Sequence, residues 1–178
     1  MFLKSRLSWN VIIPAENLDV EGLTLQKEIV IRLLKEFASK KASKNLGYFL
    51  AVTALEKIGE GKVREQMAGD VLFHVEFSCI TFKMFRGEIL EAVVHKILKH
   101  GVFLKCGPVD NIYLSNKMMS DYEYVHGENP IFMNEKMSRI EKGTVMRCIV
   151  IGTEYKEEGK ELLALVSLEG DHLGPISS

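Results

Sequence analysis

The sequence predicts an α+β protein made of two small domains, a helix-and-sheet domain over residues 1–80 and an all-β barrel over residues 81–178. Three observations lead to this fold class. Apolar residues recur every fourth position over a single stretch, residues 24–39, which is the spacing of an amphipathic helix. Apolar and polar residues alternate in most other segments, as in half-buried strands. In a long strand over residues 71–85 the apolar side chains switch from odd to even positions at Ile80. This switch indicates that the strand contributes to two hydrophobic cores.

Composition indicates a folded protein and weakens one class of function. Hydrophobic residues make up 47% of the chain and charged residues 26%, which argues against extended disorder. The net charge is −1, whereas a protein that binds nucleic acid through bulk electrostatics is clearly basic. Any contact with RNA must therefore be local, weak or assisted by a partner.

The cysteines and the hydropathy pattern indicate the cellular environment. Cys79, Cys106 and Cys148 are widely separated within apolar runs, which predicts buried free thiols in a reducing compartment. No segment has the roughly 18 apolar residues that a membrane span requires, and the first ten residues lack the features of a signal peptide. We therefore expect a soluble intracellular protein without a membrane partner.

The first domain begins with a strand over residues 7–13, which ends at Pro14 because proline cannot continue a ladder. An acidic loop over residues 15–22 leads to the helix, for which Thr24 is the expected N-cap. The apolar face of the helix consists of Leu25, Ile29, Leu33 and Phe37. This face suits either the cover of a sheet, which is the usual arrangement, or a partner. We interpret Lys40, Lys41 and Lys44 as solvated charges at the helix C-terminus.

A second strand is expected over residues 47–55, followed by a glycine-rich, highly charged segment over residues 56–70. This segment should form an exposed hairpin or loop, which serves either as a plain connection or as a docking tip. The long strand then leads into the second domain, so the domain boundary lies near residue 80.

The second domain begins with three strand-like segments, residues 87–98, 102–106 and 109–114, with a tight turn at Gly107-Pro108. A long first strand followed by a short meander is typical of a five-stranded Greek-key barrel. Strands over residues 143–151 and 162–168 complete it. Residues 116–142 between them are predicted to form a polar, irregular loop, and residues 170–178 a tail.

One face of the meander carries a candidate binding site. Strand alternation directs Phe103 and Lys105 away from the barrel interior, together with His100 and Tyr113. Lys99 belongs to a thin basic strip on the same segment, Lys83, Arg86, Lys96, Lys99 and Lys105. Aromatic rings beside cations suit the stacking of unpaired bases. On the pattern alone, ordinary half-buried strand residues are the simpler interpretation.

The motifs of common catalysts are missing from the sequence. The five histidines have no cysteine or carboxylate at the spacing of zinc ligands, and His95 and His100 would meet only on a helix. There is no glycine-rich phosphate loop before a helix and no nucleophile motif. We therefore expect no catalytic residue, no metal and no cofactor, although a small-molecule enzyme built on a barrel is an alternative.

Five segments, in order, resemble one known family. They are MFLKSRLSWNVIIP, NLGYFLAVTALEKIGEGKV, FHVEFSCITFKMFRGEILEAVV, HKILKHGVFLKCGP and HLGPI. In this order and spacing the chain resembles, over nearly its whole length, the RNA polymerase stalk subunits. This family includes the seventh-largest subunit of RNA polymerase II and the corresponding stalk protein of archaeal RNA polymerase.

The resemblance implies a fold and a function. The expected fold is an N-terminal ribonucleoprotein-like tip domain followed by an OB-fold barrel of the S-one RNA-binding type. The expected function is that of a non-catalytic subunit of a DNA-directed RNA polymerase in the nucleus. Its partners would be a second stalk subunit, in a heterodimer, the polymerase core including the largest subunit, and nascent single-stranded RNA. The alternative is a free-standing OB-fold RNA-binding module in translation or RNA decay.

The resemblance also assigns residues. The docking tip falls on Leu55, Glu56, Lys57, Ile58, Gly59, Gly61 and Lys62, and the RNA face on Lys99, His100, Phe103, Lys105 and Tyr113. His100 stands where the family usually has phenylalanine, Tyr113 where it has histidine, and Leu165 in place of a phosphate-binding arginine. Two rings without that cation predict stacking of about 1–3 kcal/mol per base and a modest, salt-sensitive affinity. Further departures fit a paralogue, such as the subunit shared by the plant polymerases IV and V of RNA-directed DNA methylation and gene silencing.

Overall fold

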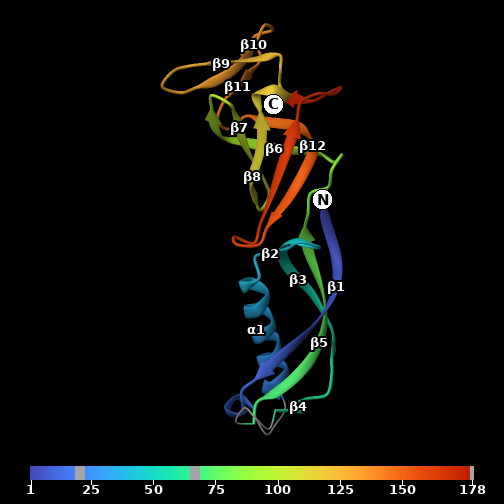
Figure 1. Ribbon diagram of the computed structural model, residues 1–178. Helices are drawn as coiled ribbons and strands as arrows, with labels where there is room; N and C mark the ends of the chain where they lie inside the picture. Colours follow the sequence, from blue (N-terminus) through green and yellow to red (C-terminus); the bar gives the residue numbers. More distant parts are fainter. Residues whose placement is uncertain (19–22, 65–68, 177–178) are drawn as a thin grey trace. The chain divides into compact units, whose positions relative to one another are not determined.

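The computed structural model describes residues 1–18, 23–64 and 69–176, which fall into two compact units (Figure 1). The N-terminal unit spans Phe2–Lys83, and the barrel unit spans Met84–Ser178 together with Met1. The division follows the end of strand β5 (Val71–Phe82), three residues after the expected boundary at residue 80.

The N-terminal unit is one antiparallel sheet covered by one helix (Figure 1). Its elements are β1 (Phe2–Ile13), a 3-10 turn (Ala15–Asn17), α1 (Leu23–Ser39), β2 (Ala42–Ser43), β3 (Gly47–Ile58), β4 (Lys62–Val63) and β5. The strand order is β1-β5-β3-β2, and β4 pairs with β5. The fold therefore matches the expected helix on a small antiparallel sheet.

The helix covers the sheet with the face that its periodicity predicts. Ile29, Leu33 and Phe37 are buried in the core of the unit. The Trp9 ring packs at 5.8 Å from that of Phe37. The helix ends at Ser39 as predicted, but Thr24 lies within it and is not its N-cap; residues 19–22 lie outside the described chain.

Lys40, at the end of the helix, is not merely a solvated charge. Its Nζ lies 3.9 Å from the centroid of the Trp9 ring, which is the geometry of a cation–π contact. The side chain therefore covers the indole that anchors the helix to the sheet.

Strand β1 begins at Phe2, five residues before the predicted start at Leu7. The reason is its partner β5, with which every residue of β1 pairs in unbroken register. Near the end of β5 the side chains of Cys79, Thr81 and Phe82 are all buried. The change at Ile80 in which positions are apolar thus reflects the burial of side chains on both faces of β5 near its end.

The barrel unit closes five strands into the predicted barrel. They are β6 (Ile89–Leu98), β7 (Gly101–Cys106), β8 (Val109–Ser115), β12 (Val145–Lys156) and β13 (Glu161–Ser167). Antiparallel pairing joins β6 to β7, β7 to β8, β12 to β13 and β12 to β6, and β13 closes the barrel in parallel with β8. This is the arrangement of an OB-fold.

Residues 116–142 are not the irregular loop that their polar composition predicts. After a 3-10 turn (Asn116–Met118) they form a small antiparallel sheet of β9 (Tyr122–Val125), β10 (Ile131–Asn134) and β11 (Arg139–Ile140), with the order β11-β10-β9. Phe132 and Ile140 are buried, so this insertion has apolar anchors of its own. The expected tail also contains a short strand, β14 (Gly174–Pro175), which pairs with β12.

The three cysteines are free thiols. Cys79 and Cys148 are buried as predicted, whereas Cys106 is only half-buried. Burial raises the pKa of the Cys148 thiol to about 12, with a smaller contribution from Cys106, so this thiol stays protonated at neutral pH.

The described residues offer neither a metal site nor a membrane-spanning helix. Within them there is no cluster of three histidine, cysteine, aspartate or glutamate side chains that would hold a metal ion. None of the helices in the described part of the chain is both long and apolar enough to cross a membrane.

We predict that Gly47→Ala destabilises the N-terminal unit more than Gly69→Ala. Both glycines have a positive φ, +79° and +84°, so alanine costs about 1–2 kcal/mol at either position. A Cβ at Gly47 would also overlap the carbonyl oxygen of Phe82, which should add about 1–3 kcal/mol, whereas at Gly69 its contact among the described residues is the Ala15 Cβ at 3.5 Å. Urea unfolding followed by the fluorescence of Trp9, the single tryptophan, measures both losses. Equal losses would contradict the close approach of β5 to Gly47.

Candidate nucleic-acid interface

Alternation along β7 and β8 divides their side chains between the barrel core and the outer surface. Val102 and Leu104 of β7 are fully buried, while Phe103 between them is half-buried on the outer face. Tyr113 has the same position on β8. The two residues are cross-strand partners, and their ring centroids lie 5.1 Å apart. Two neighbouring rings on a sheet surface form a platform on which bases can stack.

His95 of β6 adds a third ring that the sequence pattern did not identify. Its ring centroid lies 6.3 Å from that of Phe103. Its Nε2–H donates a hydrogen bond to the backbone carbonyl of Asp110, at 3.0 Å, which orients the ring. A β-bulge between Val94 and Lys96 leaves both His95 and Lys96 exposed. Alternation with the buried Ala92 and Val94 directs His95 outward, but it cannot anticipate that Lys96 is exposed as well, because no residue type here marks the bulge.

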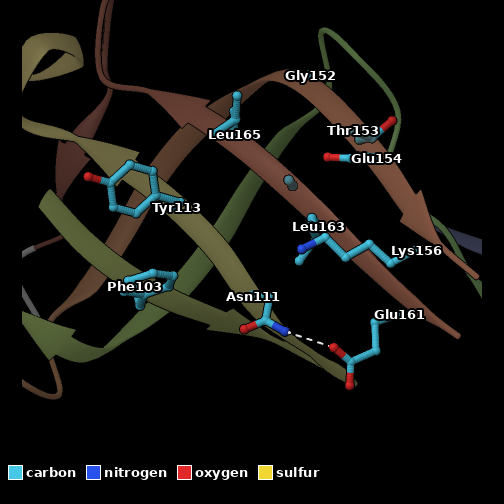
Figure 2. Close-up of a pocket in the computed structure, with 11 residues that line it drawn as sticks. Phe103, Asn111, Tyr113, Gly152, Thr153, Glu154, Lys156, Glu161, Leu163 and Leu165 are labelled. Atoms are coloured by element: carbon cyan, nitrogen blue, oxygen red, sulfur yellow. Dashed lines mark hydrogen bonds between the residues drawn. The ribbon is translucent and has the colours of Figure 1, made fainter. Parts of the chain in front are cut away.

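A groove of about 650 Å³ runs beside Phe103 and Tyr113 (Figure 2). Leu163, Ala164 and Leu165 of β13 line it with apolar surface. Leu165 is 51% exposed and is the cross-strand partner of Tyr113, so the position assigned to the missing arginine does lie next to the ring. The size and the apolar lining are those of a small-ligand site, and a nucleobase is of this kind.

The polar groups of this groove do not favour phosphate. Lys156 lines it together with the acidic residues Glu154 and Glu161. At the end away from Leu165, the Asn111 side-chain amide donates a hydrogen bond to a Glu161 carboxylate oxygen, at 3.3 Å (Figure 2). Because carboxylates repel phosphate, the groove is better suited to the bases of a strand than to its backbone.

The other residues assigned to the RNA face lie at its edge. Lys99 and His100 are exposed in the turn between β6 and β7. His100 acts through its backbone carbonyl, which accepts a hydrogen bond from the Tyr113 hydroxyl at 2.8 Å; its own ring contacts neither aromatic ring in the described structure. Lys105 is exposed and lies 3.4 Å from an Asp110 carboxylate oxygen, so its charge is partly compensated. The assignment of His100 to the RNA face therefore stays a prediction, and its described contact with the face is this backbone carbonyl.

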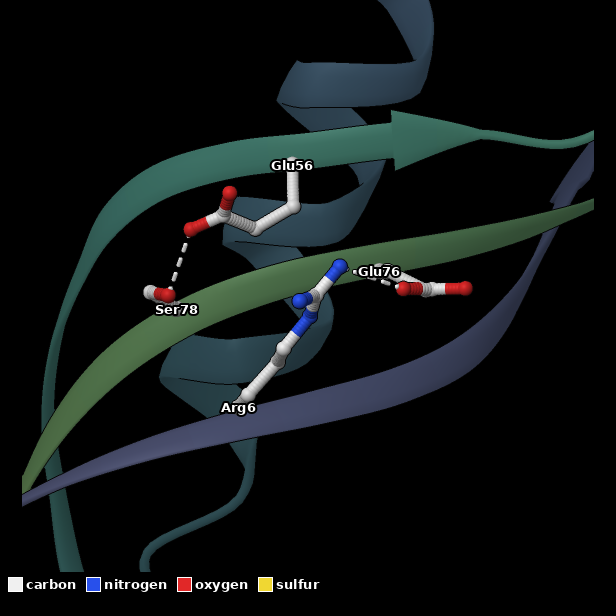
Figure 3. A network of polar contacts seen from close by, with 4 residues as sticks. All are labelled: Arg6, Glu56, Glu76 and Ser78. Atoms are coloured by element: carbon white, nitrogen blue, oxygen red, sulfur yellow. Dashed lines mark hydrogen bonds and ion pairs between the residues drawn. The ribbon is translucent and has the colours of Figure 1, made fainter.

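The residues assigned to the docking tip divide between the core and the surface. Leu55 and Ile58 pack against the core of the N-terminal unit, which leaves them little surface for a partner. Glu56 accepts a hydrogen bond from the Ser78 hydroxyl at 2.6 Å, beside the Arg6–Glu76 ion pair (Figure 3). The first contact joins β3 to β5, and the ion pair joins β1 to β5.

In its described residues, the end of the tip is polar, with one exposed apolar side chain. The Gly59 N–H donates to the backbone carbonyl of His74 at 2.7 Å, and a Cβ on Gly61 would come within 2.8 Å of the Phe73 ring. Lys57 and Lys62 are exposed, as is Val63, which is 65% exposed and was not among the assigned residues. Among the described residues, a partner would therefore meet acidic as well as basic side chains here, Glu56, Lys57, Glu60 and Lys62, together with Val63.

Comparisons with known proteins relate the chain to polymerase subunits. Residues 8–69 match a family model described as the SHS2 domain found in the N terminus of Rpb7p/Rpc25p/MJ0397. The chain is 61% identical over 177 residues, 99% of each chain, to DNA-directed RNA polymerase V subunit 7 of Arabidopsis thaliana. It is 54% identical over 175 residues to DNA-directed RNA polymerase IV subunit 7 of the same plant, covering 98% of this chain and 99% of the relative. It is 34% identical over 158 residues to DNA-directed RNA polymerase II subunit RPB7 of Glycine max, covering 88% and 87%.

We predict that Leu165→Arg strengthens the binding of an unstructured oligouridylate at low salt, by about three- to tenfold. The arginine would add a phosphate contact beside Tyr113, and each such contact steepens the dependence of log K on log salt by about 0.7 for a single strand. Fluorescence anisotropy across a salt series measures both changes.

The matched control is Val145→Arg, which adds the same charge at a 39% exposed position of β12 that does not line the groove. An equal gain in both variants would mean that only net charge matters. This result would contradict the assignment of the groove.

Proposed function

The chain belongs to the subunit 7 family of DNA-directed RNA polymerases, and from this premise we propose that it docks on the polymerase core as a stalk subunit and contacts nascent single-stranded RNA. It is an accessory subunit and does not carry the polymerase active site. The OB-fold barrel supports the RNA contact, because this fold commonly presents a sheet face to single strands.

The degree of identity supports an assignment within the family. The chain is 61% and 54% identical to subunits of polymerases V and IV but 34% identical to a polymerase II subunit. We therefore assign it to a polymerase of the IV/V type, acting in the nucleus. A role in RNA-directed DNA methylation and gene silencing follows from this assignment and stays a prediction.

The observation that carries the RNA contact is the pair of outward rings beside an apolar groove. The ring centroids of Phe103 and Tyr113 lie 5.1 Å apart at the groove wall. Both side chains are half-buried, so they are fixed in place yet accessible. Stacking on such rings contributes about 1–3 kcal/mol per base. With a net charge of −1, the chain adds little long-range attraction. Binding should therefore be modest and depend on the polymerase to hold the transcript nearby.

Docking on the core is proposed through the end of the N-terminal unit. The hydrogen bonds of Glu56 and Gly59 to β5 stiffen this end, and Lys57, Lys62 and Val63 present its exposed surface. A stiff, mainly polar tip suits a contact of limited area with a larger assembly, since little ordering is required on binding. The heterodimer with a second stalk subunit is part of the same proposal.

We predict that Phe103→Ala/Tyr113→Ala separates the two activities in the native cell. A tagged chain should copurify with the largest polymerase subunit and a second small subunit, and ultraviolet cross-linking should join it to RNA. The double variant should retain the polymerase subunits but lose most of the cross-linked RNA, about fivefold or more, because two stacking contacts are removed. Mass spectrometry and labelling of the cross-linked RNA measure the two results.

The control is Tyr155→Ala, which removes a half-buried ring of the same barrel that does not line the groove. Unchanged RNA cross-linking in the double variant would exclude the proposed face. A chain recovered without polymerase subunits would instead support the free-standing RNA-binding module.

A further inference from the structure

A second groove, of about 460 Å³, opens on the other side of the ring row. It lies between the last part of β6 and the small inserted sheet, and Lys96, Asn129 and Lys142 are among the residues that line it. The insertion therefore extends the surface of the barrel, and neither the family resemblance nor the comparisons assign a role to this groove.

His95 connects the two grooves. It lines the second groove, and its ring contacts that of Phe103, which lines the first. Tyr113, Phe103 and His95 thus stand on the adjacent strands β8, β7 and β6, with ring centroids 5.1 Å and 6.3 Å apart. A row of rings across three strands forms one continuous track that runs perpendicular to the strands.

The charges of the two grooves are complementary to different parts of a nucleic-acid strand. The first groove has one lysine, Lys156, against the carboxylates of Glu154 and Glu161. The second has Lys96 and Lys142 against Glu141 alone, with His95 beside them. Since phosphates prefer cations, a strand whose bases stack in the first groove should place its backbone in the second.

We propose that the second groove is the continuation of the RNA site: a single strand stacked on Tyr113 and Phe103 passes over His95 and lays its next phosphates against Lys96 and Lys142. This inference rests on the proposed RNA contact of the barrel. It assigns base stacking to the first groove and phosphate binding to the second. It also gives the inserted sheet, which supplies Asn129 and the segment leading to Lys142, a function in RNA binding.

We predict that Lys96→Ala/Lys142→Ala weakens the binding of a long RNA and leaves a short one unaffected. A tetrauridylate, about the shortest site of an OB-fold, fits on the ring face, whereas a dodecauridylate reaches both grooves. Binding of the dodecamer to the full chain, copurified with its second subunit, should fall about five- to tenfold at low salt, and its salt slope should decrease by about 1.4. Binding of the tetramer should change less than about twofold. Fluorescence anisotropy with both labelled oligonucleotides measures these values.

The matched control is Lys117→Ala/Lys136→Ala, which removes two exposed lysines of the same unit that line neither groove. An unchanged affinity of Lys96→Ala/Lys142→Ala for the dodecamer, or an equal loss of affinity in the control, would contradict the proposed role of the second groove. The Phe103→Ala/Tyr113→Ala variant keeps this result distinct from a failure of the proposed function. If that variant still binds the tetramer normally, the proposed stacking on Phe103 and Tyr113 is contradicted. If it no longer binds the tetramer, the stacking proposal holds and the result with the lysine variant tests the second groove alone.

Discussion

The period-two alternation of β7 and β8 in a closed barrel is the constraint on which the proposed site depends. Val102, Leu104, Ile112 and Leu114 are fully buried in the barrel. Each such side chain contributes about 1.5–3 kcal/mol to folding. A slip of one residue would expose all four and bury the residues between them, so the core fixes Phe103 and Tyr113 on the outer surface. The position of the proposed binding face is thus a direct consequence of how the barrel is stabilised.

Strand register also shapes the N-terminal unit, but there it is interrupted along one strand. There β5 lies between β1 and β3, and its register with β1 is unbroken over twelve pairs. Its pairing with β3, by contrast, contains three irregularities, between Phe49 and Ala51, Val52 and Ala54, and Leu55 and Lys57. These bulges bend β3 along its length and bring Leu55 and Ile58 onto the core. The described part of the tip, through Ile58 and Gly59, is therefore an ordered extension of the sheet.

Much of this fold could be predicted from the sequence, because its main elements have a clear periodicity. The helix face of Ile29, Leu33 and Phe37 and the barrel strands around Gly107 follow from local pattern alone. The errors arise where tertiary contacts override that pattern. The inserted sheet has strands of two to four residues, too short for alternation to be recognised, and polar residues surround the buried Phe132 and Ile140.

The candidate site was predictable to a similar extent. Phe103 and Tyr113 could be placed on the outer face because the barrel register determines both. His95 also faces outward by alternation, but its contact with Phe103 could not be predicted, because a bulge next to it shifts the register between β6 and β7. The role of His100 stays a prediction, because position in a family pattern does not determine where a turn residue directs its ring. The docking role of Ile58 likewise stays a prediction, since this apolar residue near the tip also packs against the core that supports it.

The proposed RNA contact depends on whether bases stack on the outward rings. Fluorine NMR of the full chain labelled with 3-fluorotyrosine, copurified with its second subunit, tests this directly, since the chain has five tyrosines and Tyr113→Phe identifies the resonance of Tyr113. On addition of oligouridylate, we predict that the Tyr113 resonance shifts most, as its ring becomes covered by a base. RNA binding that leaves the Tyr113 resonance unmoved while other tyrosines respond would contradict the proposed contact.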